Sequence, residues 1–108
     1  MSKKESKFQA ELIEELSEMF PGCIILKNDE QYIQGIPDLT ILHKKKWAML
    51  ECKRTADASR RPNQEHYVKK ADAMSFARFI EPSNREEVLG ELQQTFRTGR
   101  NPRILKCE

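Results

Sequence analysis

Two short apolar runs near the middle of the chain carry charged residues at their ends. Asp38 opens the run 39–42, and the triplet Glu51, Cys52 and Lys53 closes the run 47–50. Because a strand alternates its side chains, Glu51 and Lys53 share one face and Cys52 lies on the other. If the two runs pair as neighbouring strands, Asp38 joins Glu51 and Lys53. The pattern therefore predicts that two carboxylates and one amine meet at one place on a sheet.

The chemistry of these three groups favours a metal site. Mg²⁺ takes oxygen ligands, commonly one or two carboxylates together with phosphate oxygens of a substrate. A lysine beside the metal orients a water or offsets charge on a phosphate. A Glu-x-Lys pair is also common as a solvated ion pair, and Pro37-Asp38 is a frequent turn dipeptide. Acids at the ends of the most apolar strands cost free energy, however, so the combination indicates metal-assisted phosphodiester hydrolysis.

Length and composition bound the fold and the partners. With 108 residues, 38% of them apolar and 33% charged, the chain is expected to form one soluble domain over 1–108. Its core is expected over about 5–96, followed by a basic tail over about 97–108. No apolar run is long enough to cross a membrane and no signal peptide is recognised, so we expect a cytoplasmic protein. A net charge of +2 permits nucleic-acid binding without requiring it.

The cysteines do not indicate a zinc site. Cys23, Cys52 and Cys107 are far apart and form no CxxC pair. Their odd number suggests reduced thiols. Cys52 is expected in the core, and neither His43 nor His66 is placed by the sequence to activate it as a nucleophile.

The chain predicts the element order α-β-β-β-α-β-α. Apolar residues at helical spacing indicate a first helix over about 5–20, which Pro21-Gly22 ends. Strands are expected over 23–26, 38–42 and 47–53, the last two joined as a hairpin, and over 75–80. A helix capped by Asn63 runs to about 74, and a last helix begins after Ser83 or Asn84. The fold class is α/β, a mixed sheet with helices on its faces.

The residues resemble a known group of nucleases. The segment 35–39 (Gly-Ile-Pro-Asp-Leu), the triplet 51–53 (Glu-Cys-Lys) and the order of elements resemble the PD-(D/E)xK superfamily. The closer resemblance is to the small VRR-NUC members, many of them phage-encoded and related to Holliday-junction resolvases. Residues 5–9, which open the first helix, and 60–64, where Gln64 begins a helix, add to this similarity. The resemblance covers about residues 5–80 and implies a restriction-endonuclease-like core.

The resemblance also implies roles for individual residues. Asp38 and Glu51 would hold Mg²⁺ or Mn²⁺, with the backbone carbonyl of Cys52 as a third ligand. Lys53 would position the attacking water, and Gln64 would reach back toward that water or the scissile phosphate. No small-molecule cofactor is expected.

An acid on the first helix would complete the metal site. Glu5 matches the opening motif of the family best. Glu11, Glu14 and Glu15 are the alternatives, because the docking of the helix is not determined by the sequence.

Several groups are candidates for binding nucleic acid, with a solvated surface as the alternative for each. Tyr67 shares a helix face with Gln64 and either contacts DNA, supports Lys53 or packs on the sheet. The acidic loop 28–31 would either lie off the DNA path or supply Asp29 and Glu30 to the metal. The candidates are Lys44, Lys45, Lys46, Arg54, Arg60, Arg61, Tyr67, Lys69 and Lys70, with Arg97, Arg100, Arg103 and Lys106 in the tail.

The leading hypothesis is a metal-dependent DNA endonuclease that selects branched DNA such as a Holliday junction. The chain is short and has no evident recognition helix for reading sequence. A homodimer would place two sites across a junction, using Met74, Phe76, Phe79 and Phe96 unless these complete the core. The alternatives are a nickase or exonuclease acting on flaps or ends, and a catalytically idle DNA- or protein-binding module.

Overall fold

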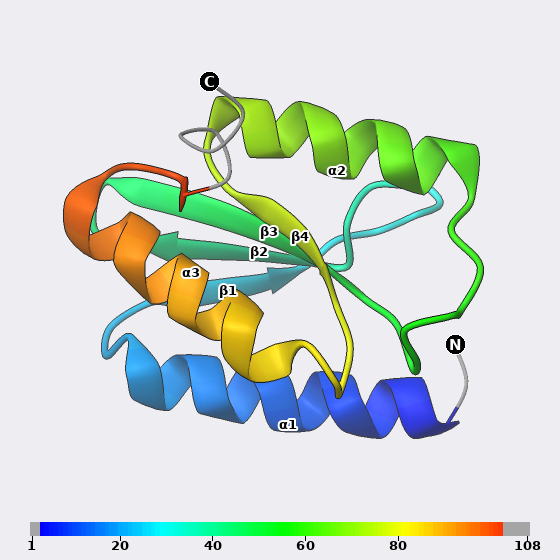
Figure 1. Cartoon of the computed structure of the whole chain (residues 1–108), viewed down its shortest axis with the longest axis horizontal. Coiled ribbons are helices and arrows are strands. Elements are labelled where there is room, and N and C mark those ends of the chain that lie inside the picture. Colours follow the sequence, from blue (N-terminus) through cyan, green and yellow to red (C-terminus); the bar gives the residue numbers. More distant parts are fainter. Residues whose placement is uncertain (1–2, 103–108) are drawn as a thin grey trace.

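The computed structural model describes residues 3–102, which form three helices and one four-stranded sheet in the expected order (Figure 1). The elements are α1 (Lys3–Met19), β1 (Ile24–Lys27), β2 (Leu39–His43), β3 (Lys46–Cys52), α2 (Pro62–Met74), β4 (Ala77–Ile80) and α3 (Arg85–Thr98). The α/β class and the mixed sheet predicted from the sequence are confirmed.

The strands lie side by side in the order β1-β2-β3-β4. β1 pairs with β2 and β2 with β3 in antiparallel fashion, whereas β4 runs parallel to β3. The parallel pair requires a crossover, which α2 supplies. In the β2–β3 hairpin Leu39 lies opposite Leu50, and His43 lies opposite Lys46. This register decides which charged residues meet at each end of the sheet.

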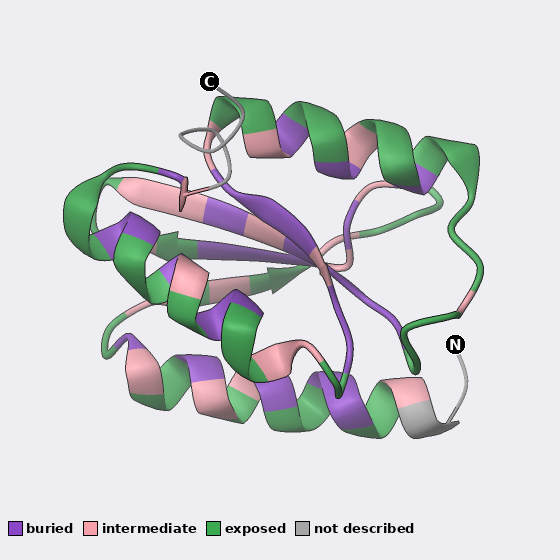
Figure 2. Cartoon of the chain, viewed as in Figure 1, coloured by how far each residue is buried: buried purple, intermediate pink, exposed green. Residues whose placement is uncertain are grey.

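Helices α1 and α3 cover one face of the sheet and α2 covers the other (Figure 1). The larger core lies on the α1/α3 face, where Leu12, Leu16, Ile41, Leu50 and Leu92 are fully buried. A smaller cluster lies under α2. Figure 2 shows this arrangement as buried positions along β2, β3 and β4 and exposed outer faces on the helices, whereas β1 at the edge of the sheet has no buried position. The burial of apolar side chains on both faces is the main favourable term in folding.

The structure shifts several predicted boundaries by one to three residues. Helix α2 begins at Pro62 with Arg61 as its N-cap residue, so Asn63 lies inside the helix instead of capping it. A proline suits the first helical position because its missing N–H would have no partner there. Helix α3 begins after Asn84 and extends to Thr98, so Arg97 belongs to this helix and not to the basic tail expected from about residue 97.

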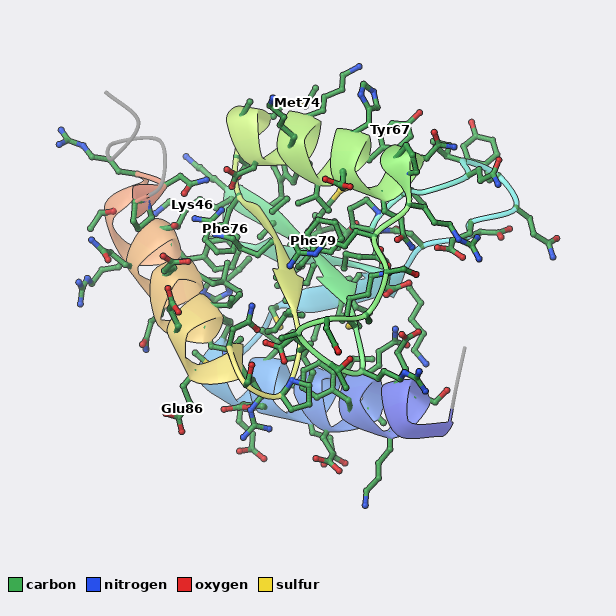
Figure 3. All side chains as sticks on the ribbon, turned by 45° about the vertical axis from the view of Figure 1, so that its right-hand side comes forward. Lys46, Tyr67, Met74, Phe76, Phe79 and Glu86 are labelled. Carbon is green, nitrogen blue, oxygen red and sulfur yellow. The ribbon has the colours of Figure 1, made fainter. Side chains whose placement is uncertain are left out.

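Two of the four residues considered for a dimer contact are part of the core. Phe76 is fully buried and Phe96 is 7% exposed, which leaves neither on the surface. Phe79 is half-buried against the cluster under α2, and only Met74 is largely exposed (Figure 3). These phenylalanines complete the monomer, because the sheet needs apolar cover on both faces.

A buried arginine ties β4 to both neighbouring helices. The Arg78 guanidinium forms ion pairs with Asp72 of α2 and with Glu91 of α3, the latter at 3.1 Å. It also donates to the Asn101 side chain at 2.8 Å. The guanidinium lies over the Phe76 ring, 4.2 Å from its centroid. Because its charge is fully compensated, Arg78 can be 2% exposed at the edge of the sheet.

Cys52 lies in the core, as predicted from the sequence. Cys52 is buried in the main core and Cys23 is partly buried, both as free thiols, while Cys107 lies outside the described residues. His43 stacks on Phe96, with ring centroids 5.7 Å apart, at the end of β2 remote from Cys52.

Over residues 3–102 no helix has the length and apolar character needed to span a bilayer.

Candidate functional site

The hairpin register brings the predicted acids together. Asp38 directly precedes Leu39, which lies opposite Leu50, so Asp38 lies beside Glu51 on the neighbouring strand. The Cys52 backbone N–H donates to Asp38 Oδ2 at 2.9 Å and holds this carboxylate in place. Alternation along β3 sends Cys52 into the core and turns Glu51 and Lys53 toward the α2 face, as predicted.

The side chains of Asp38, Glu51 and Lys53 line a cavity of about 230 Å³. It is lined by residues from the start of α1, the loop 28–38 and the loop 53–61, and these three segments lie on the right in Figure 1. Its lining is predominantly polar. The lining residues are Glu5, Glu30, Asp38, Glu51, Lys53, Ser59, Arg61 and Gln64.

Gln64 links the acid and the base of the Glu-x-Lys pair. Its Nε2 donates to Glu51 Oε2 at 3.1 Å, and its Oε1 accepts from Lys53 Nζ at 2.7 Å. Lys53 Nζ also donates to the Ser59 carbonyl at 3.0 Å, and the Arg61 backbone N–H donates to Gln64 Oε1. The Lys53 ammonium lies 3.9 Å from Glu51 Oε2. All three side chains are therefore held in one orientation by bonds to fixed groups.

One oxygen of this network is left without a partner. Glu51 Oε1 is the one buried side-chain oxygen or nitrogen in the described part of the chain that has no hydrogen bond. Oxygens of Glu30, Asp38 and Glu51 lie within 4.8 Å of one another. A buried, unpaired carboxylate oxygen is unfavourable unless a ligand satisfies it. An all-oxygen donor set of this kind suits a hard divalent cation, so the residues fit the metal that the resemblance implies.

The pKa values of the two buried acids reflect this crowding. Burial raises the pKa of Glu51 to about 8, and the nearby Asp38 carboxylate adds to the effect. Burial raises the pKa of Asp38 to about 6, against the lowering effect of the bond from Cys52. Lys53 lowers both values without cancelling the desolvation. The raised pKa values mean that both carboxyl groups ionise less readily than usual, and a nearby positive charge would favour their ionised forms.

The loop before β2 is fastened to the sheet and to α2. The Asn28 side chain donates to the Pro37 carbonyl and to the Thr40 hydroxyl, and its backbone N–H donates to the Asp38 carbonyl. Gly35 packs directly on Asn63, so a Cβ built at Gly35 would lie 2.5 Å from Asn63 Cβ. These contacts hold Glu30 and Asp38 at the cavity.

Among the first-helix acids, only Glu5 lines the cavity. Glu15 lies 3.5 Å from Arg85 in an ion pair, and Glu11 lines a different hollow beside Arg85. Glu14 is exposed and does not reach the cavity. The helix docks with its N-terminal turn at the site, which explains why the later glutamates point elsewhere. The acidic loop supplies Glu30, one of the two acids considered there.

The predicted DNA-binding residues lie at several separate places on the structure. Arg61 lines the cavity. The hairpin tip with Lys44 and Lys45 lies just beyond the opposite end of β2, and that end is about 17 Å from Asp38 at ~3.3 Å per residue. Lys46 donates to the Phe96 carbonyl and so caps α3 in part.

Five further candidates lie on α2 or on the loop before it, outside the cavity lining. Arg60 lies over the Phe79 ring, 4.1 Å from its centroid. Tyr67 is half-buried beside His66. Arg54, Lys69 and Lys70 are exposed. Of the tail candidates, Arg97 and Arg100 are exposed, whereas Arg103 and Lys106 lie outside the described residues.

The chain was compared with protein-family models, with curated proteins and with solved structures, and none of them matches. The family assignment and the roles it implies, including the Cys52 carbonyl as a ligand, stay predictions.

Two contacts at the candidate site were missed from the sequence. The Ser59 carbonyl accepts from Lys53, and Asn28 anchors the loop that carries Glu30 and Asp38. A backbone acceptor leaves no signal in a sequence. Asn28 has a weak one, since an asparagine just after a strand often fixes a loop through its side chain.

Proposed function

We propose that this protein is a DNA endonuclease that depends on Mg²⁺ or Mn²⁺. The observation that supports the proposal best is the meeting of Asp38, Glu51 and Lys53 in one cavity, with Glu51 Oε1 unsatisfied. Two carboxylates with an adjacent fixed ammonium are suited to phosphodiester hydrolysis, since they can hold a cation and offset charge on a phosphate.

Asp38 and Glu51 would hold the cation, with Glu30 or Glu5 nearby. A divalent cation bound there would act as a Lewis acid toward a phosphate oxygen and make a water more acidic. The Asp38 carboxylate stays oriented because Cys52 N–H occupies Oδ2. Gln64 occupies Glu51 Oε2, which would leave the buried Oε1, without a hydrogen-bond partner, for the cation.

Lys53 would orient the attacking water and stabilise the pentavalent phosphate. In the reaction, the water oxygen forms a bond to phosphorus while the bond from phosphorus to the 3′ oxygen breaks. The water loses a proton and the leaving 3′ oxygen gains one, which gives a 5′-phosphate and a 3′-hydroxyl as the resemblance implies. The Lys53 ammonium is already directed by Gln64 and Ser59, so little reorganisation is required.

The proposed substrate is branched DNA, cut by two copies of the chain acting as a pair. The hairpin tip with Lys44 and Lys45 would contact the backbone about five residues of strand away from the acids, which fits an extended substrate. Such contacts position DNA without reading its sequence.

The test is cleavage of a synthetic four-way junction, a flap and a linear duplex in the presence of Mg²⁺ or Mn²⁺. We expect wild-type protein to cut the junction, and Asp38→Asn, Glu51→Gln and Lys53→Met to lose activity by about 100-fold or more. Glu14→Gln is the matched control, an exposed α1 glutamate outside the cavity, and should retain wild-type activity.

Two results would contradict the proposal: no cleavage of any substrate by the wild type, or cleavage by Asp38→Asn at the wild-type rate. DNA binding with no metal binding in calorimetry would instead support the idle DNA-binding module.

A further inference from the structure

A second cavity adjoins the acidic one. It has a volume of about 270 Å³ and lies between the loop residues Gln34 and Gly35 and the first turn of α2. The two cavities share Glu30, Arg61 and Gln64 in their linings. A ligand that enters the second cavity therefore lies next to the groups proposed to act on a phosphate.

The walls of this second cavity are well defined. Gly35 has φ +89° and contacts Asn63 so closely that no Cβ fits between them, which joins the loop to the helix. Pro62 at the start of α2 adds a rigid, apolar surface to the lining. Two side-chain amides, Gln34 and Asn63, add donors and acceptors at this cavity.

The size and charge of the cavity select the part of a nucleotide that can enter. A sphere of 270 Å³ is about 8 Å across, which admits one base but not a duplex, whose major groove alone is about 12 Å wide. The Glu30 carboxylate repels a phosphate but accepts a hydrogen bond from a base N–H. Arg61, at the boundary with the acidic cavity, is the cation that suits the phosphate.

We propose that this cavity binds one unpaired nucleobase of the substrate strand, next to the phosphate that is cut. The inference rests on the proposed function and narrows its substrate class to DNA with an unpaired nucleotide at the cut position, such as a flap, a gap or a branch with an open centre. Removing a base from a duplex costs unstacking and unpairing free energy, and the cost is least where the base is already unpaired. A fully paired duplex is therefore the poorer substrate.

The first experiment does not depend on cleavage. Metal-free ¹⁵N-labelled protein is titrated with a DNA trinucleotide that has adenine in the middle, and with the same trinucleotide lacking that base. We expect the adenine to shift the side-chain NH₂ signals of Gln34 and Asn63 and the backbone signal of Gly35, and the abasic form to leave them in place. Equal shifts with both trinucleotides, or no shift at these positions, would overturn the inference.

The second experiment fills the cavity. Gln34→Trp should reduce flap cleavage at least tenfold and abolish the adenine-dependent shifts, with the Mg²⁺ affinity unchanged. Gln31→Trp is the control, because Gln31 is exposed on the same loop and does not line the cavity. Equal cleavage by the two tryptophan variants would refute the base pocket while leaving the nuclease proposal intact. If the wild type cuts nothing but adenine still shifts Gln34 and Asn63, the nuclease proposal fails and the base pocket stands.

Discussion

The Gln64 side-chain oxygen lies 2.7 Å from Lys53 Nζ, and the nitrogen of the same amide donates to Glu51. One amide from α2 thus fixes both charged groups that β3 presents to the cavity. It also leaves Glu51 Oε1 as the free end of the network.

If the amide serves to position these groups, Gln64→Ala should lower kcat/KM for junction cleavage by about 10- to 100-fold, as for groups that orient metal ligands. Mg²⁺ affinity should fall as well, which calorimetry would measure. The control is Gln94→Ala, an exposed glutamine on α3. A Gln64→Ala enzyme within twofold of wild type would contradict this role.

The raised pKa values of Asp38 and Glu51 predict how stability depends on pH. Because these values lie above those of the unfolded chain, the folded metal-free protein binds more protons, and its stability falls as the pH rises from about 4 to about 8. Mg²⁺ competes with these protons, so its stabilising effect on Tm should be small at pH 5 and large at pH 8. Glu51→Gln should raise the Tm of metal-free protein at pH 8 and abolish most of the increase with Mg²⁺. An increase in Tm that is the same at both pH values would argue against the site.

The contact between Gly35 and Asn63 should be costly to disturb. Gly35→Ala combines a positive φ with a Cβ that has no room, and should destabilise the fold by about 1–3 kcal/mol. Gly90→Ala is the matched control in α3, where a Cβ meets nothing, and should stabilise by about 0.5–1 kcal/mol. Urea unfolding would measure both; a neutral Gly35→Ala would show that the loop is not held as described.

The Arg78 network should contribute far more to stability than a surface pair. Arg78→Ala leaves Asp72 and Glu91 without their cation and should cost about 3–5 kcal/mol. Arg85→Ala breaks the more exposed pair with Glu15 and should cost about 0–1 kcal/mol. Thermal unfolding of the two variants side by side would separate these expectations, and equal losses would contradict them.

The hairpin tip should affect DNA affinity and not catalysis. Replacing Lys44 and Lys45 by glutamate should weaken junction binding. It should also reduce the slope of log K for DNA binding against log salt concentration by about one per lysine. kcat at saturating DNA should stay unchanged, because the tip lies beyond the end of β2 that is about 17 Å from Asp38. Lys69→Glu with Lys70→Glu makes the same charge change on α2 for comparison. If the Lys44 and Lys45 variant binds the junction as tightly as the wild type, the tip is solvated surface and does not contact DNA.

Much of the local structure was predictable from the chain. The order of helices and strands, the pairing of the 38–53 hairpin and the opposite facing of Cys52 and Glu51 follow from periodicity and alternation, which depend on near neighbours only. The exact helix ends were less predictable, because Arg61 caps α2 through its backbone geometry and not through a typical capping side chain.

The amino-acid sequence by itself determined which groups stand at the ends of β2 and β3 and which face of the sheet they occupy, because side chains alternate between the two faces along a strand. Only the tertiary structure decided that Glu5 and Glu30 join them, that Gln64 bridges Glu51 and Lys53, and that Phe76 and Phe96 belong to the core. The physical reason is that these contacts depend on how a helix or a loop docks against the sheet. Docking is set by packing over the whole core, which no local pattern encodes.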